Sequence, residues 1–197
     1  MRYILIAASF FLSGCVTLKT PITEYRIETA MAQEKSISQE CRDKSLKIVE
    51  AFSPNSLMTL SMEYAESDGR VFAYTQSRWQ ESPKDALTLQ LLKSIRASDI
   101  FGSVDTAKSR SKSSMILEAH LEEFLQFYSQ DMQSSYALIS VSFSFIDTKT
   151  NSVVAHKSLS AKVDTKSADA KGGVEALNNA LTKVLQENRA WLDEVCK

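Results

Sequence analysis

Histidine, glycine, proline and cysteine are all scarce in this chain of 197 residues, which holds two, five, three and three of them, respectively. The glycines form neither a P-loop nor a Rossmann fingerprint, and no serine stands in a Gly-x-Ser-x-Gly nucleophile elbow. The cysteines lack the Cys-x-x-Cys spacing of a redox or zinc site. A formal net charge of −1 gives no reason to expect nucleic acid as a partner. The sequence therefore predicts a binding or assembly module, not an enzyme, with no cofactor or metal.

The start of the chain carries the clearest motif. An apolar run from Ile4 to Leu12 follows Arg2 and leads into Leu12-Ser13-Gly14-Cys15. The run is too short for a permanent membrane-spanning helix, and the small residues at its end suit a peptidase. This pattern is typical of a bacterial lipoprotein signal peptide, residues 1–14, so we expect cleavage before Cys15 and lipidation of its thiol. A secretory signal followed by an incidental cysteine is the alternative.

Fatty chains on Cys15 would hold the mature protein on a membrane without a transmembrane helix. Val16 stands where an inner-membrane retention signal usually places Asp, which favours the inner leaflet of the outer membrane over the inner membrane. We expect residues 15–22 to form a lipidated tether in the periplasm and residues 23–197 to form one domain. Within that domain, Cys41 and Cys196 either form a disulfide or remain two free thiols.

Alternation of apolar and polar residues predicts most of the strands. Tyr25 and Ile27 mark a first strand, and Asp68-Gly69 predicts the tight turn of a hairpin. Three long strands, at residues 115–128, 136–146 and 153–163, are expected to form an antiparallel meander with one buried face. In the last of them the residues expected to point inward are Val153, Ala155, Leu159, Ala161 and Val163.

Two segments have helical spacing. Ser82 and Pro83 are suited to the start of a helix that ends at Ser98-Asp99, with Leu87, Leu91 and Ile95 on one side. Gly172-Gly173 is expected to break the chain before a last helix. The predicted fold class is α+β: a two-layer, mainly antiparallel sheet with two amphipathic helices packed on one face.

A metal site can be considered at only one place in the sequence. Glu118, His120 and Glu122 share one face of a predicted strand and could present three ligands to a metal, as in a metal-dependent hydrolase. The same spacing also describes the solvent face of a half-buried strand. We favour the solvent face, because nothing else in the chain supports a metal site.

Two groups of aromatic residues are candidates for function. Phe124, Phe127 and Tyr128 stand near the end of a strand and could form an exposed apolar lip for a lipid chain or a protein partner. Core packing at the end of a sheet is the alternative, and we favour it as the more usual explanation. Trp79, just before the first helix, could act as a hydrophobic staple against that helix.

From Arg78 onward the chain resembles the ABC-type transport auxiliary lipoproteins, the family of paraquat-inducible protein C. The resemblance rests on Arg78-Trp79 with Pro83 four residues on, the leucine-striped helix, and Ile100-Phe101-Gly102-Ser103-Val104. The lipobox, the first strand, the meander and the closing helix follow in the family's order. A polar loop from Met31 to Lys44 and the two remaining cysteines depart from the family pattern.

The resemblance implies a non-enzymatic accessory subunit of a mammalian-cell-entry transporter, which moves phospholipid or other hydrophobic molecules across the envelope. Its partners would be the substrate-binding protein, the permease and the ATPase of that transporter, with lipid contact and self-association left open. Arg78, Trp79 and Pro83 would then be structural rather than ligand-binding. The alternative is a lipoprotein cofactor of a cell-wall synthase or of an outer-membrane assembly machine.

Overall fold

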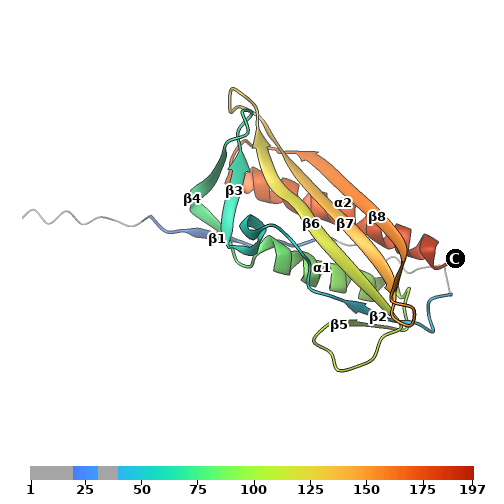
Figure 1. Ribbon diagram of the computed structural model, residues 1–197. Coiled ribbons are helices and arrows are strands. Elements are labelled where there is room, and N and C mark those ends of the chain that lie inside the picture. The colour runs from blue at the N-terminus through green and yellow to red at the C-terminus, as the bar shows by residue number, and fades with distance from the viewer. Residues whose placement is uncertain (1–19, 31–39) are drawn as a thin grey trace, which may run out of the picture.

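The computed structural model describes residues 20–30 and 40–197. The expected signal peptide, Cys15 and most of the expected tether lie outside these residues. None of the helices in the described part is long and apolar enough to cross a membrane. The elements follow one another as β1 (Thr23–Tyr25), β2 (Ser45–Ile48), the 3₁₀ helix η1 (Asn55–Met58), β3 (Ser61–Ala65), β4 (Val71–Trp79), α1 (Pro83–Ser98), β5 (Ser103–Thr106), β6 (Met115–Tyr128), β7 (Ser135–Asp147), β8 (Ser152–Asp164) and α2 (Ala170–Val195) (Figure 1).

The eight described strands form one mixed sheet. The long strands β6, β7 and β8 pair antiparallel, as the alternation predicted. Strand β6 also has two parallel neighbours on its other side, β2 at its first three residues and β3 near its end. The α+β class is confirmed, but "mainly antiparallel" holds only for the meander and the β3–β4 hairpin. The short strands pair in parallel through long crossovers, and their sequences contain no signal for that choice of neighbour.

A bulge in β6 reverses which residues face inward. Leu121 pairs with Val141, but the next pair is Glu123 with Ser140, so Glu122 is an extra residue. Before the bulge the buried residues are odd-numbered, and after it Phe124, Gln126 and Tyr128 are buried. Which residues at the aromatic end of β6 point inward therefore could not be predicted from the alternation at the start of the strand.

A second irregularity lies at the start of β8. Phe145 pairs with Ala155, whereas Ile146 pairs with Val153, which leaves Val154 as the extra residue. The bulge places Val153 on the side of Ile146, and Val153 and Val154 are 58% and 53% exposed. The expectation that Val153 points inward is wrong for this reason, while Leu159 and Ala161 are buried as expected.

The predicted hairpin and first helix are confirmed. Gly69 adopts a φ of 85° in the turn between β3 and β4, a conformation that favours glycine. The Ser82 side chain accepts a hydrogen bond from the backbone N–H of Asp85, and Pro83 occupies the first helical position. Asp99 ends the helix with left-handed backbone angles.

The paired glycines lie inside the last helix, not before it. Helix α2 begins at Ala170, and Asp169 caps it by accepting the backbone N–H of Gly172 at 2.7 Å. A Cβ on Gly173 would lie 1.9 Å from Oε1 of Gln126, and one on Gly172 would lie 2.1 Å from a backbone oxygen. The expected chain break is therefore wrong. Gly173 needs to be glycine because the first turn of α2 approaches Gln126 of β6 closely, and Gly172 because the chain folds back on the backbone of Ser167.

Candidate functional surfaces

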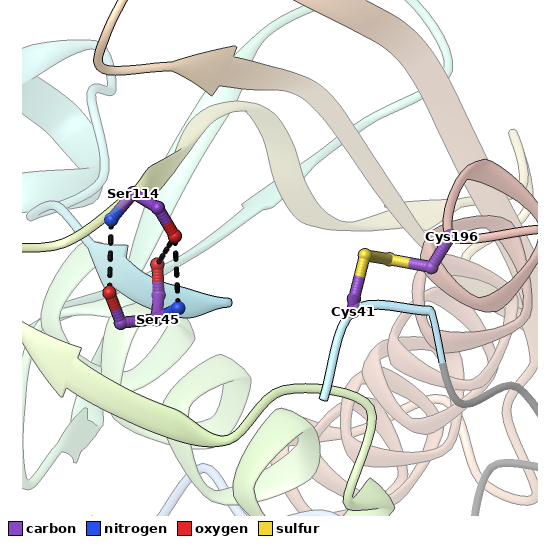
Figure 2. Close-up of a disulfide and its surroundings, with 4 residues drawn as sticks. All are labelled: Cys41, Ser45, Ser114 and Cys196. Carbon is purple, nitrogen blue, oxygen red and sulfur yellow. Dashed lines mark hydrogen bonds between the residues drawn. A yellow bond between two sulfur atoms is a disulfide. The ribbon is translucent and has the colours of Figure 1, made fainter. Parts of the chain in front are cut away.

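The structure pairs Cys41 with Cys196 in a disulfide, at an Sγ–Sγ distance of 2.10 Å (Figure 2). The bond joins the turn before β2 to the end of α2 across 155 residues of sequence. In the chain-entropy model, closing a loop of this length stabilises the folded state by about 5 kcal/mol. Of the two alternatives that the sequence left open, the structure adopts the disulfide.

A reciprocal pair of serines joins two strands on the same side of the molecule. The Ser45 N–H donates to Oγ of Ser114 at 3.0 Å, and the Ser114 N–H donates to Oγ of Ser45 at 2.9 Å (Figure 2). These bonds hold the start of β2 against the residue that precedes β6. The disulfide therefore ties the turn before β2 to the end of α2, and the serine pair holds β2 beside β6, so both have a structural role.

The Arg78, Trp79 and Pro83 segment contributes mainly to the interior. The Trp79 side chain is 2% exposed, and its ring meets that of Phe124 edge to face, with centroids 5.7 Å apart. Pro83 is buried at the start of α1. Arg78 forms an ion pair with Glu24 of β1, and both side chains are nearly half exposed. Exposed pairs of this kind add less than about 1 kcal/mol, so Trp79 dominates the energetics of the segment.

Two of the three residues considered for an apolar lip are buried, as the favoured alternative of core packing predicts. Phe124 and Tyr128 are 4% and 7% exposed, because the bulge at Glu122 turns them inward. Phe127 lies on the opposite side of the sheet and stacks on Tyr136 of β7, with centroids 5.2 Å apart. The alternative of core packing therefore describes Phe124 and Tyr128.

A buried glutamine connects the sheet to the start of α2. Gln126 is fully buried and accepts a hydrogen bond from the Tyr74 hydroxyl at 2.9 Å. Its Nε2 donates to Oγ of Ser135 at 2.9 Å and to the backbone oxygen of Asp169 at 3.2 Å. Buried polar groups are costly without hydrogen-bond partners. The bonds of Gln126 therefore hold the start of α2 against β6. Sequence reasoning missed Gln126 because regular alternation from the start of β6 would place it on the solvent face.

The two tyrosines of this network are poor candidates for proton transfer. Burial raises the pKa of Tyr74 and Tyr128 above the ordinary value for tyrosine, and their hydroxyl oxygens are 2.7 Å apart. Both phenols therefore stay neutral at physiological pH. They act here as hydrogen-bonding groups in a packed aromatic cluster with Tyr64.

Glu118, His120 and Glu122 do not form a metal site. They lie on the solvent face of β6, in an open hollow of about 510 Å³ that also contacts Phe52 and His156. Glu122 is the extra residue of the bulge, and its carboxylate accepts a hydrogen bond from Ser142. Within residues 20–30 and 40–197, no three His, Cys, Asp or Glu side chains are placed to hold a metal ion. The solvent-face alternative describes these residues.

An exposed apolar surface lies beside helix α1. Phe52 and Met58, in the connection between β2 and β3, are 58% and 49% exposed, and Leu89 of α1 is 37% exposed. They line two hollows that share Glu50: Phe52 and Met58 line one of about 420 Å³, and Leu89 lines one of about 320 Å³ together with Ile48 and Leu92. We call the two hollows together the α1 groove. Its rim includes Glu50, Thr88, Thr106, Ala107 and Lys108, and Lys84 forms ion pairs with Glu50 and Asp85. Sequence reasoning missed this surface because its residues show no common periodicity.

Comparison with known proteins gives one family match. The family model for the ABC-type transport auxiliary lipoprotein component matches residues 25–187. No curated protein matches the chain.

Several solved structures have the same fold. Protein XCC0632 from Xanthomonas campestris, described as a DUF330 protein, is 16% identical, with a TM-score of 0.77 over 88% of this chain and 96% of that chain. An uncharacterized protein is 13% identical, with a TM-score of 0.67 over 87% and 98%. The hypothetical protein CT253 from Chlamydia trachomatis is 11% identical, with a TM-score of 0.51 over 78% and 98%. At these identities the likeness shows the fold alone.

Proposed function

Because the chain belongs to the ABC-type transport auxiliary lipoprotein family, we propose that it is the non-enzymatic auxiliary subunit of a mammalian-cell-entry transporter. Such a transporter moves phospholipid or other hydrophobic molecules between the two membranes of the envelope. In this role the chain binds the periplasmic part of the transporter and holds it near a membrane. The permease, the ATPase and the substrate-binding protein are other chains.

The observation that carries the proposal is the extent of the family match, residues 25–187, which leaves only short ends of the expected domain unmatched. The described residues agree with a role in binding. The candidate metal ligands on β6 are solvent-facing, and the buried polar network around Gln126 is satisfied by structural partners. Transfer of a lipid along an apolar path needs no covalent chemistry from this subunit.

Lipidation of Cys15 supplies the membrane anchor in this proposal. The lipobox supports it, and Val16 favours the inner leaflet of the outer membrane. The Cys41–Cys196 disulfide supports an oxidising compartment such as the periplasm, since disulfides are rare in proteins of the cytosol. The anchor keeps the domain at high local concentration near its partner.

The α1 groove is the surface that we assign to the protein partner. Phe52, Met58 and Leu89 offer exposed apolar contact area, and the ion pairs of Lys84 with Glu50 and Asp85 give it a polar rim. An apolar centre with a polar rim is the usual anatomy of a protein interface. The partner that fits this surface is the tunnel-forming, substrate-binding subunit.

Deleting the gene is expected to sensitise cells to detergents and lipophilic drugs, because the transporter would lose its attachment. Re-expression of the wild-type chain, or of the exposed-surface control Lys171→Ala, should restore resistance. Re-expression of Cys15→Ala should not, since the uncleaved precursor lacks the fatty chains that hold the domain near its partner. Minimal inhibitory concentrations of a detergent measure this effect. Full rescue by a soluble periplasmic version would contradict the role of the anchor.

A further inference from the structure

The described chain begins close to where a lipid anchor would hold it. Thr20 is exposed and precedes β1, which pairs with Ser77–Trp79 of β4. Five residues of extended chain span at most about 17–18 Å, so Cys15 and its membrane lie within that distance of Thr20. In Figure 1 these first residues, in blue, lie on the side of the molecule that carries β1 and β4, away from β7 and β8.

The tether is too short for the opposite side of the sheet to rest on the same membrane. Strand β8 is separated from β1 by β4, β3, β6 and β7. Five strand spacings amount to about 24 Å, which exceeds the reach of the tether. If the sheet stood on its β8 edge, Thr20 would lie farther from the membrane than its chain allows. The β1–β4 edge has no such restriction.

The β1–β4 edge also exposes apolar side chains. Ile22 is 47% exposed, and Val71 and Phe72, at the start of β4, are 52% and 37% exposed. Strand β1 pairs only with Ser77–Trp79, so residues 71–76 of β4 have a strand neighbour on one side only among the described elements. The Arg70 guanidinium lies 5.4 Å from the centroid of the Phe72 ring. Phenylalanine and aliphatic side chains are among the groups that interfacial segments bury at the boundary between headgroups and acyl chains.

The charged side chains named along this edge form pairs of opposite charge. Arg70 forms ion pairs with Glu66 at 2.6 Å and Asp68 at 2.7 Å. Arg78 pairs with Glu24 of β1, and Arg26 pairs with Glu28 at 3.1 Å. The named pairs leave no excess of positive charge that would require anionic lipid. Contact with a bilayer would depend on the apolar side chains, and zwitterionic phospholipid would suffice.

We propose that the β1–β4 edge is the membrane-facing side of this protein, with Ile22, Val71 and Phe72 in contact with the phospholipid surface to which Cys15 is anchored. This orientation rests on the proposed lipid anchor and goes beyond it, because an anchor alone would allow the domain to tumble.

Three tryptophan reporters test the orientation, and two of them are matched in exposure. Val71 and Val154 are equally exposed, at 52% and 53%, and lie on opposite edges of the sheet. The lipidated full-length mature protein is reconstituted into phosphatidylcholine vesicles, with and without brominated acyl chains, as Val71→Trp, Ile22→Trp and Val154→Trp. The native Trp79 and Trp191 are buried and give a common background.

Brominated lipid should cause a loss of fluorescence from Val71→Trp and Ile22→Trp but not from Val154→Trp. Equal quenching of the three reporters, or quenching of Val154→Trp alone, would overturn the orientation. Flotation of the vesicles tests the anchor separately. A protein that floats without selective quenching contradicts only the orientation, whereas a protein that does not float contradicts the anchor and the orientation with it.

Discussion

Replacing Cys15 with alanine is expected to abolish lipidation and to leave an uncleaved precursor. The thiol is the only group at this position that can carry the diacylglyceryl chain, and the lipoprotein peptidase cuts before the modified cysteine. Loss of the fatty chains removes the membrane anchor that the proposal assigns to this residue. Metabolic labelling with a palmitate analogue, followed by mass spectrometry of the N-terminus, measures both effects.

The other two cysteines provide the control for this experiment. A Cys41→Ala/Cys196→Ala variant removes the disulfide but keeps the lipobox, so it should label like the wild type. Label that persists at the wild-type level in Cys15→Ala would show that the lipobox assignment is wrong. The secretory-signal alternative would then apply.

Replacing Trp79 with alanine is expected to destabilise the domain by about 3–5 kcal/mol, as for other large buried aromatic side chains. Trp79 is 2% exposed and packs edge to face on Phe124, so the substitution leaves a cavity between β4 and β6. Urea unfolding of the chain from Thr17 onward, followed by circular dichroism, gives the change in the free energy of unfolding.

The neighbouring Arg78 is the matched control for Trp79. Arg78→Ala removes one exposed ion pair with Glu24, which should cost less than about 1 kcal/mol. An unchanged unfolding midpoint for Trp79→Ala, combined with weaker binding of the partner, would mean that Trp79 is a docking residue and not a core residue.

Much of the fold follows from local patterns in the sequence. The alternation in β7 predicts Ile139, Val141, Phe143 and Phe145 as core residues, and all four are buried. The start of α1 follows from Ser82 and Pro83, whose capping geometry depends only on adjacent residues. These features could be predicted because their causes lie within a few positions of each other.

The predictions that were wrong concern features whose physical cause lies far away in the sequence. An extra residue in a strand is recognised only from its pairing with the adjacent strand. The bulge at Glu122 therefore cannot be predicted from the sequence of β6 alone. That single residue decides that Phe124 and Tyr128 are interior and not an exposed lip. Gly173 is explained only by Gln126, which is 47 positions earlier and fills the space that a Cβ would need.

The candidate surfaces were harder to predict than the fold. Phe52 and Met58 lie in a connection without periodicity, and Leu89 faces outward from a helix whose other leucines are mostly buried. Exposed apolar residues in loops carry no signal that distinguishes contact surface from interior. The pairing of β1 with β4, which brings Ile22 to the same edge as Val71 and Phe72, is equally non-local.

Crosslinking in intact envelopes, followed by purification of this chain and identification of its partners, tests the proposed function most directly. The wild type and a Val154→Glu control should recover a mammalian-cell-entry protein with its permease and ATPase. A Phe52→Glu variant, which places a charge in the α1 groove, should recover much less of them. Recovery of a cell-wall synthase or a β-barrel assembly protein, and no transporter subunit, would contradict the role as a transporter auxiliary.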